Sequence, residues 1–307
     1  MPRHITFVFP GQGSQSLGML DSLPENLVSK YKDEIVETLD FDLIDIIKNG
    51  DAEELNKTSI TQPAILLTSF LYYEHISNLL NIKPNLLCGH SLGEYSALLV
   101  GGSLSFRDAL LLVHKRGLLM EKSEKGLMYA ILNTNLSIIM DVCNTVAKET
   151  NLIVSPANIN TPNQVVVSGN VEAVKLVLKY LKEKGFRKNI KLNVKVPSHC
   201  HLMNNPAAKF KKLLDKLSLE LPQYDVIHNK NAQISTSIND LKTNLVEQLT
   251  HPVMWVNIMK YIKNFNGIII ECGPGSVLSG LAYGNGINKN VYSTSSNKFL
   301  EDIKKDI

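Results

Sequence analysis

Residues 85–95 read NLLCGHSLGEY and place Ser91 in a Gly-x-Ser-x-Gly pattern. Two leucines come before the pattern, and apolar residues at helical spacing follow it from Tyr95 to Leu99. A strand that turns sharply into a helix pushes its corner side chain outward, and a Cβ on either flanking glycine would collide with a neighbouring element. The pattern alone can arise by chance, but this context predicts a nucleophilic serine at the carboxyl edge of a sheet.

Composition sets limits on the kind of protein. A chain of 307 residues can form one large domain or two of ordinary size. Its 44% hydrophobic and 20% charged residues are typical of a globular protein. The net charge of +3 is too small to indicate nucleic-acid binding, although it is compatible with an acidic protein partner. The four cysteines contain no C-x-x-C pair, which disfavours a zinc knuckle or a disulfide framework and indicates reduced thiols.

We expect no secretion signal and no membrane span. The apolar run at residues 5–9 is ended by Pro10 and is too short for a signal peptide. No segment approaches the roughly 20 apolar residues that cross a bilayer. The sequence therefore predicts a cytoplasmic protein that has no membrane partner.

The loop after this first expected strand carries Gln12 between two glycines. A dinucleotide-binding fingerprint would need a third glycine at position 16, which is Ser16, so that interpretation fails. Two alternatives remain: a solvated glutamine in a tight turn, or a glutamine that reaches an adjacent site. The following region is mostly helical and includes a helix that starts near Thr61 and contains Pro63.

Arg116 falls on the apolar face of the next long helix, which Ser105 and Asp108 are expected to cap. It lies four residues after Leu112 and four before Met120. A guanidinium on a buried face requires an anionic partner, because an unpaired buried charge is strongly disfavoured. A core carboxylate, or extension of the side chain to solvent, would be a purely structural explanation, and both stay open here.

Residues 126–196 have the order of elements of a ferredoxin-like unit, βαββαβ. Strands are expected at 128–132, 152–155, 164–168 and 190–196, and helices at 136–148 and 171–184. The segments on either side continue one sheet-and-helix pattern. The sequence therefore predicts a small subdomain inserted into a larger one.

Two histidines, His199 and His201, follow this unit. A metal site is disfavoured because the pair has no carboxylate or cysteine cluster nearby. A serine hydroxyl needs a base to attack at neutral pH, so one histidine could activate Ser91. The residues alone do not say which.

A second glycine corner lies near the end of the chain. A buried strand is expected at 267–271 and leads through Gly273-Pro274-Gly275 into apolar residues at helical spacing. This repeats the geometry expected around Ser91, so we expect both corners in one sheet.

Seven segments, in this order, resemble the malonyl-CoA:acyl-carrier-protein transacylases, a family of acyltransferases. They are 7–15 FVFPGQGSQ, 62–64 QPA, 89–94 GHSLGE, 116–120 RGLLM, 158–169 NINTPNQVVVSG, 196–200 VPSHC and 271–275 ECGPG. Each is weak alone, but the ordered set spans most of the chain. The resemblance implies an α/β fold: an α/β-hydrolase-like large subdomain with a mostly parallel sheet (1–125 and 197–307), interrupted by a ferredoxin-like subdomain (126–196).

The resemblance also implies an activity. A member of this family would transfer a malonyl group from malonyl-CoA to the phosphopantetheine thiol of acyl carrier protein, in type II fatty-acid biosynthesis, without metal or cofactor. Ser91 would carry the malonyl group, and His199 would be the base. The backbone N–H groups of Gln12 and Leu92 would form the oxyanion hole, and Arg116 would bind the malonyl carboxylate.

The remaining implied positions concern the edges of the site. Gln248 would lie beside the base, whose ring a main-chain carbonyl orients, so that Ser91 and His199 form a dyad. Met120, Asn160 and Gln62 would contact substrate. His201 falls where the family tolerates alanine or proline, and it is given no role. Tyr129 and the short loop 121–125 depart from the family pattern and could alter the pocket rim.

Two other functions remain open. A serine hydrolase acting on esters or thioesters would share the serine corner, but it has less reason to place Arg116 in the pocket. A scaffold that binds carrier protein through a vestigial site would not need the intact set of Ser91, His199, Gln12 and Arg116.

Overall fold

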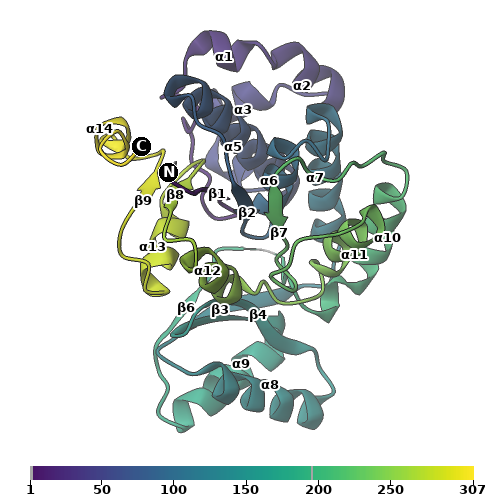
Figure 1. Cartoon of the computed structure of the whole chain (residues 1–307). Helices are drawn as coiled ribbons and strands as arrows, with labels where there is room; N and C mark the ends of the chain where they lie inside the picture. Colours follow the sequence, from purple (N-terminus) through teal and green to yellow (C-terminus); the bar gives the residue numbers. More distant parts are fainter. Residues whose placement is uncertain (1–2, 195) are drawn as a thin grey trace.

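The larger of two sheets forms the centre of the protein (Figure 1). The structure is a computed structural model that describes residues 3–194 and 196–307. The five strands of the larger sheet are all parallel, in the order β7-β2-β1-β8-β9. They are β1 (Ile5–Phe9), β2 (Leu86–Gly89), β7 (Asp225–Ile227), β8 (Ile268–Glu271) and β9 (Val291–Ser293). The three central strands are buried along their whole length, which explains their mostly apolar sequences.

Helices cover both faces of this sheet. They are α1 (Glu25–Ser29), α2 (Lys32–Leu39), α3 (Leu43–Asn49), α4 (Ala52–Leu55), α5 (Thr58–Leu80), α6 (Gly93–Val100), α7 (Phe106–Glu121), α10 (Asn204–Leu214), α11 (Ile238–Glu247), α12 (Trp255–Lys263), α13 (Val277–Gly284) and α14 (Phe299–Ile303). Phe7 and Phe9 pack into one hydrophobic cluster with α5, α6 and α7. Val8, on the opposite face, packs with Ile258 of α12 and Leu278 of α13. Within the described residues, no helix is long and apolar enough to cross a bilayer.

Helix α5 starts three residues earlier than predicted and contains Pro63 in its second turn. Proline has no N–H group, so the carbonyl of Ser59 loses its helical donor. His114 of α7 replaces that donor, with its Nδ1 atom 2.9 Å from the Ser59 oxygen. The proline is therefore tolerated because α7 packs against α5 at this point.

The second sheet forms between residues 126 and 191. Its elements are β3 (Gly126–Leu132), α8 (Leu136–Thr150), β4 (Val154–Thr161), β5 (Gln164–Asn170), α9 (Val171–Glu183) and β6 (Asn189–Lys191). The strands are antiparallel, in the order β4-β5-β3-β6, which confirms the ferredoxin-like arrangement. We propose residues 126–196 as the inserted subdomain.

Two strands of this sheet differ by more than two residues from their predicted bounds. β4 begins later and runs to Thr161, where bulges and a parallel bridge from Asn158 to Val253 of the larger part support its polar second half. β6 ends at Lys191, whereas a strand was expected at 190–196, of which residue 195 lies outside the described residues. Leu192 and Val194 pack against the sheet face that carries Met128. Helices α8 and α9 cover the other face, below the sheet in Figure 1. The uncovered apolar face is therefore turned toward the larger part.

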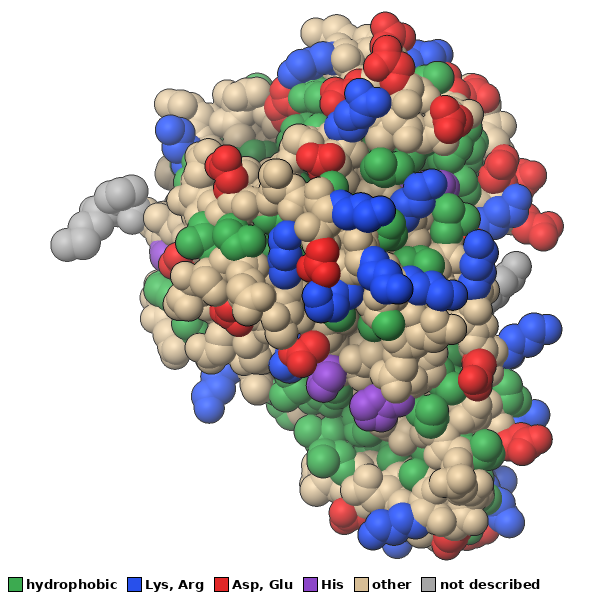
Figure 2. All heavy atoms as spheres, turned by 90° about the vertical axis from the view of Figure 1, so that its right-hand side faces the viewer, with side chains coloured by type: hydrophobic (Ala, Val, Ile, Leu, Met, Phe, Trp, Pro, Cys, Tyr) green, Lys and Arg blue, Asp and Glu red, His purple; other side chains and the backbone are tan. Residues whose placement is uncertain are grey.

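A group of Lys and Arg side chains crosses the face that includes α10 and α11 (Figure 2). Four exposed lysines on or just after α10 contribute to this face: Lys209, Lys211, Lys212 and Lys216.

Candidate active site

Ser91 occupies a sharp corner between β2 and α6, at the carboxyl edge of the large sheet. Its φ is 52°, in the left-handed region that disfavours non-glycine residues. A Cβ on Gly89 would come within 2.0 Å of the Gly93 carbonyl group, and a Cβ on Gly93 within 2.0 Å of the Phe9 oxygen. Both glycines are thus required by the close approach of β1, β2 and α6, and this packing holds the strained serine.

The histidine that reaches Ser91 is His199. Its Nε2 atom lies 2.8 Å from the Ser91 Oγ, and its Nδ1 atom lies 2.7 Å from the main-chain oxygen of Gln248. A carbonyl oxygen only accepts, so Nδ1 carries the proton and Nε2 is free to accept the serine hydroxyl proton. His199 also has a positive φ of 61°, and its N–H donates to Leu249. Both backbone and ring are therefore fixed relative to Ser91.

The surroundings of His199 favour its neutral form. Burial, followed by the positive charge of Arg116, lowers its pKa to about 3, while the Gln248 carbonyl acts in the opposite direction. The ring is therefore unprotonated at neutral pH, as a general base must be.

Two backbone N–H groups beside Ser91 are available. Across residues 3–194 and 196–307, neither the Gln12 nor the Leu92 N–H donates a hydrogen bond. Both residues line the same cavity as Ser91. Leu92 also immediately precedes α6, whose N-terminus favours negative charge. These groups could stabilise an oxyanion on an acyl group attached to Ser91.

Arg116 is 1% exposed and lines this cavity. Its Nη1 donates to Gln62 Oε1 and its Nη2 to Gln248 Oε1, each at 2.9 Å. Its Cζ lies 5.3 Å from the centre of the Tyr95 ring. Among the described residues its Nε has no partner and no carboxylate pairs with it, so the structural ion pair considered from sequence is wrong.

Because its partners are neutral, Arg116 keeps an uncompensated positive charge at the cavity wall. A planar guanidinium of this kind suits a ligand carboxylate.

The other predicted site residues divide into two groups. Met120 lines the cavity, whereas Gln62 and Gln248 are fully buried behind Arg116. Asn160 lies in an adjoining cavity that shares Gln12, His90, Asn158 and Leu192 with the first. There the Oδ1 of Asn160 is 2.9 Å from the His90 Nε2.

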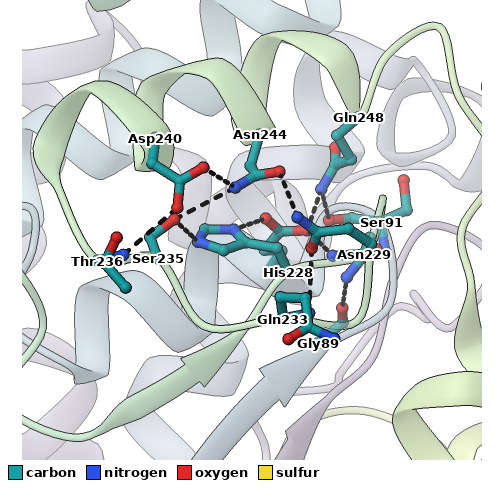
Figure 3. Close-up of polar contacts among 12 residues, drawn as sticks. Gly89, Ser91, His228, Asn229, Gln233, Ser235, Thr236, Asp240, Asn244 and Gln248 are labelled. Atoms are coloured by element: carbon teal, nitrogen blue, oxygen red, sulfur yellow. Dashed lines mark hydrogen bonds and ion pairs between the residues drawn. The ribbon is translucent and has the colours of Figure 1, made fainter.

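A polar network behind the serine corner was not predicted (Figure 3). Asn229 accepts from the Ser91 N–H through Oδ1 at 2.6 Å and donates from Nδ2 to the Gly89 oxygen at 2.6 Å. Its own N–H donates to Glu94. The only sequence signal was an acidic residue inside the apolar helix after Ser91, and its partners lie more than 130 positions away.

The remaining candidates have no visible part in the site. His201 is exposed, with its ring 6.4 Å from that of His251. All four cysteines are buried free thiols. In the part of the chain that the structure describes, no cluster of three or more His, Cys, Asp or Glu residues could hold a metal ion.

Comparison with known proteins gives consistent matches. The family described as "Acyl transferase domain" matches residues 6–278. The malonyl CoA-acyl carrier protein transacylase of Bacillus subtilis (strain 168) is 42% identical over 283 residues, covering 90% of this chain and 89% of that protein.

Solved structures agree with this result. The malonyl CoA-acyl carrier protein transacylase of Coxiella burnetii has a TM-score of 0.94 at 35% identity, covering 100% of this chain and 98% of that one. The complex PlMCAT:AntF, a type II PKS acyl-carrier protein with its malonyl-transacylase, matches with a TM-score of 0.91 at 37% identity, covering 97% of this chain and 99% of that one.

Proposed function

Because this chain belongs to the acyl transferase family, we propose that it transfers a malonyl group from malonyl-CoA to the phosphopantetheine thiol of acyl carrier protein. This reaction supplies type II fatty-acid biosynthesis. One observation carries the proposal: a hydrogen-bonded serine and histidine share a cavity with an arginine that has no carboxylate partner among the described residues.

In the first half of the reaction, His199 accepts the Ser91 proton at Nε2 while Ser91 Oγ attacks the thioester carbon of malonyl-CoA. Negative charge develops on the thioester oxygen and is stabilised by the N–H groups of Gln12 and Leu92. Each such contact commonly lowers a barrier by about 3–4 kcal/mol. The C–S bond then breaks, the protonated His199 returns the proton to the departing thiolate, and coenzyme A leaves.

In the second half, the thiol of the carrier protein attacks the malonyl-serine ester. His199 takes the thiol proton and returns it to Ser91 Oγ when the ester bond breaks. Arg116 holds the malonyl carboxylate through both halves. An acetyl group would leave this buried cation unpaired, and the site therefore selects acyl groups that carry a carboxylate.

The partners that follow are malonyl-CoA and acyl carrier protein, and the reaction uses no nucleic acid, membrane, metal or cofactor. The cytoplasmic location stays a prediction from the sequence.

The test is intact-protein mass spectrometry after separate incubation with malonyl-CoA and acetyl-CoA. We expect one malonyl group on the wild type, removal of that group by holo acyl carrier protein, and much less acetylation. A malonyl-enzyme that reacts with water faster than with the carrier thiol would favour the serine hydrolase. Absence of any acyl-enzyme would favour the scaffold.

A further inference from the structure

Glu94 is a fully buried carboxylate behind the site, and no step of the proposed reaction uses it. It lies in the first turn of α6, just beyond Ser91, and its side chain does not line the cavity. A buried carboxylate is costly unless its oxygens are well paired. Its partners therefore indicate what it does.

Three groups from two distant parts of the chain surround this carboxylate. Oε1 lies 2.7 Å from His228 Nδ1, and Oε2 accepts from the Asn229 N–H at 2.9 Å and from Gln248 Nε2 at 2.8 Å. Figure 3 shows these donors converging from the loop after β7 and the end of α11. Glu94 therefore ties the start of α6 to the segment that orients the base.

The amide of Gln248 can adopt only one orientation here. Its Nε2 donates both to Glu94 and to the Ser91 main-chain oxygen, the latter at 2.9 Å. Its Oε1 accepts from Arg116 Nη2 at 2.9 Å. Carboxylate and carbonyl oxygens only accept and a guanidinium only donates, so turning the amide over would make every one of these contacts repulsive.

We propose that Glu94 is a positioning residue for Arg116, acting through the side chain of Gln248. Glu94 accepts a hydrogen bond from the Gln248 amide nitrogen and so directs the amide oxygen at the Arg116 guanidinium. This contact sets the orientation of the guanidinium toward the cavity. This inference rests on the proposed function, in which the Arg116 guanidinium binds the malonyl carboxylate.

The main-chain oxygen of Gln248, which receives His199 Nδ1, does not move when the side-chain amide turns. Loss of the Glu94 contact should therefore disturb the orientation of Arg116 more than that of His199. A purely structural Glu94 would behave differently, because it would lower stability and slow transfer of all acyl groups alike.

The experiment compares kcat/KM for malonyl-CoA with that for acetyl-CoA in Glu94 variants, together with thermal unfolding. Glu94→Met removes the acceptor while keeping the length of the side chain. Glu94→Asp retains a carboxylate but withdraws it by one methylene, and it keeps the test available where the methionine variant does not fold. Leu98→Ala, a buried change on the same helix, is the matched control for lost stability.

Glu94→Gln should retain function. Its amide oxygen can still accept from Asn229 and Gln248, while its amide nitrogen faces His228. The His228 ring can accept there at Nδ1 and donate from Nε2 to Ser235 Oγ, which lies 2.6 Å away.

We expect the malonyl-to-acetyl ratio to fall roughly 10- to 100-fold in Glu94→Met and less in Glu94→Asp, mainly through the KM for malonyl-CoA. Glu94→Gln and Leu98→Ala should keep the ratio. When Arg116 is already replaced by alanine, the Glu94 variants should no longer change the malonyl-to-acetyl ratio.

A folded Glu94→Met or Glu94→Asp protein that keeps the wild-type ratio would overturn this inference alone, provided that the wild type prefers malonyl-CoA. Equal loss with both substrates would overturn it too. A wild type that forms no malonyl-enzyme would instead overturn the proposed function, and the inference with it.

Discussion

Two strand–glycine–helix corners flank β1, one after β2 and one after β8. They differ in whether a side-chain carboxylate accepts hydrogen bonds from the N–H groups at the start of the following helix. At the second corner, the fully buried Glu271 accepts from the N–H groups of Leu278 and Ser279 at 2.9 and 2.7 Å and from the Ser279 hydroxyl at 2.7 Å. At the first corner, within the described residues, the Leu92 N–H has no acceptor. The Glu271 carboxylate accepts from the N-terminus of α13, whereas the N–H group at the start of α6 is free to bind a ligand.

The corners also differ in how they turn. The second uses glycine at positive φ, with Gly273 at 141° and Gly275 at 79°. The first places Ser91 at a φ of 52°, which costs conformational energy that the packed surroundings must offset. The difference teaches that similar sequence patterns form a closed structural corner or an open reactive one, depending on where a carboxylate points and which residue bears the strain.

Replacing the serine of the open corner should have the largest effect. Ser91→Ala should abolish acyl-enzyme formation and lower kcat roughly 10⁶-fold, because no other group is placed to carry the acyl chain. Intact mass and steady-state transfer to carrier protein measure this. Ser276→Ala at the closed corner is the control and should leave both unchanged. A Ser91→Ala protein that still gains a malonyl group would remove the distinction between the corners.

Removing the cation that faces the open corner should have the next largest effect. Arg116→Ala should lower kcat/KM for malonyl-CoA roughly 30- to 5,000-fold, the equivalent of about 2–5 kcal/mol. Transfer of acetyl should be kept or increased, since the acetyl group has no carboxylate to pair. Parallel assays with both thioesters measure the change. Equal loss with the two substrates would contradict the carboxylate clamp.

The base that faces the open corner and the carboxylate of the closed corner should respond to acid in opposite directions. His199 has a pKa of about 3 in the folded protein, below its ordinary 6.5, so the unfolded chain binds its proton first as the pH falls. From pH 6.5 toward 3, this group should lower the unfolding free energy, by up to about 1.4 kcal/mol per pH unit. Burial raises the pKa of Glu271, which therefore favours the folded state on acidification.

Unfolding measured against pH tests this contrast. His199→Gln should flatten the acid loss, Glu271→Gln should steepen it, and His201→Ala, a change at a nearby exposed histidine, should match the wild type. An unchanged pH slope in His199→Gln would show that this imidazole does not resist protonation.

The closed corner should affect stability with little effect on chemistry. Glu271→Gln replaces one of the two oxygens that accept from Leu278 and Ser279 by an amide nitrogen, which only donates, and it should cost about 1 kcal/mol of unfolding free energy. Transfer of malonyl should stay near the wild-type rate. Chemical denaturation and the standard transfer assay measure the two. A large loss of activity with full stability would mean that the second corner belongs to the site.

Much of the fold could be predicted from the sequence. The prediction of an α/β protein with a ferredoxin-like unit is confirmed, because parallel strands buried on both faces and the βαββαβ order leave clear hydrophobic patterns. The helix start at Thr58 was missed because His114, from another helix, compensates for Pro63. β4 was placed too early because its polar second half is supported by Val253, far along the chain.

The site was predictable where a short motif carries the residue, and not where partners converge from distant segments. Ser91 stands in such a motif, whereas the pairing of Arg116 with Gln62 and Gln248 depends on tertiary packing. Glu94 shows the limit most clearly: its position is local, and its three partners are not. The catalytic and binding roles stay predictions until the variants are measured.

The burial of every cysteine has a practical consequence for such measurements. Burial raises the pKa of all four thiols, to about 12 for Cys143, so the folded protein presents almost no reactive thiolate. In the first half of the reaction, run without carrier protein, a colorimetric sulfhydryl reagent would therefore report the coenzyme A released and give no background from the protein's own sulfur.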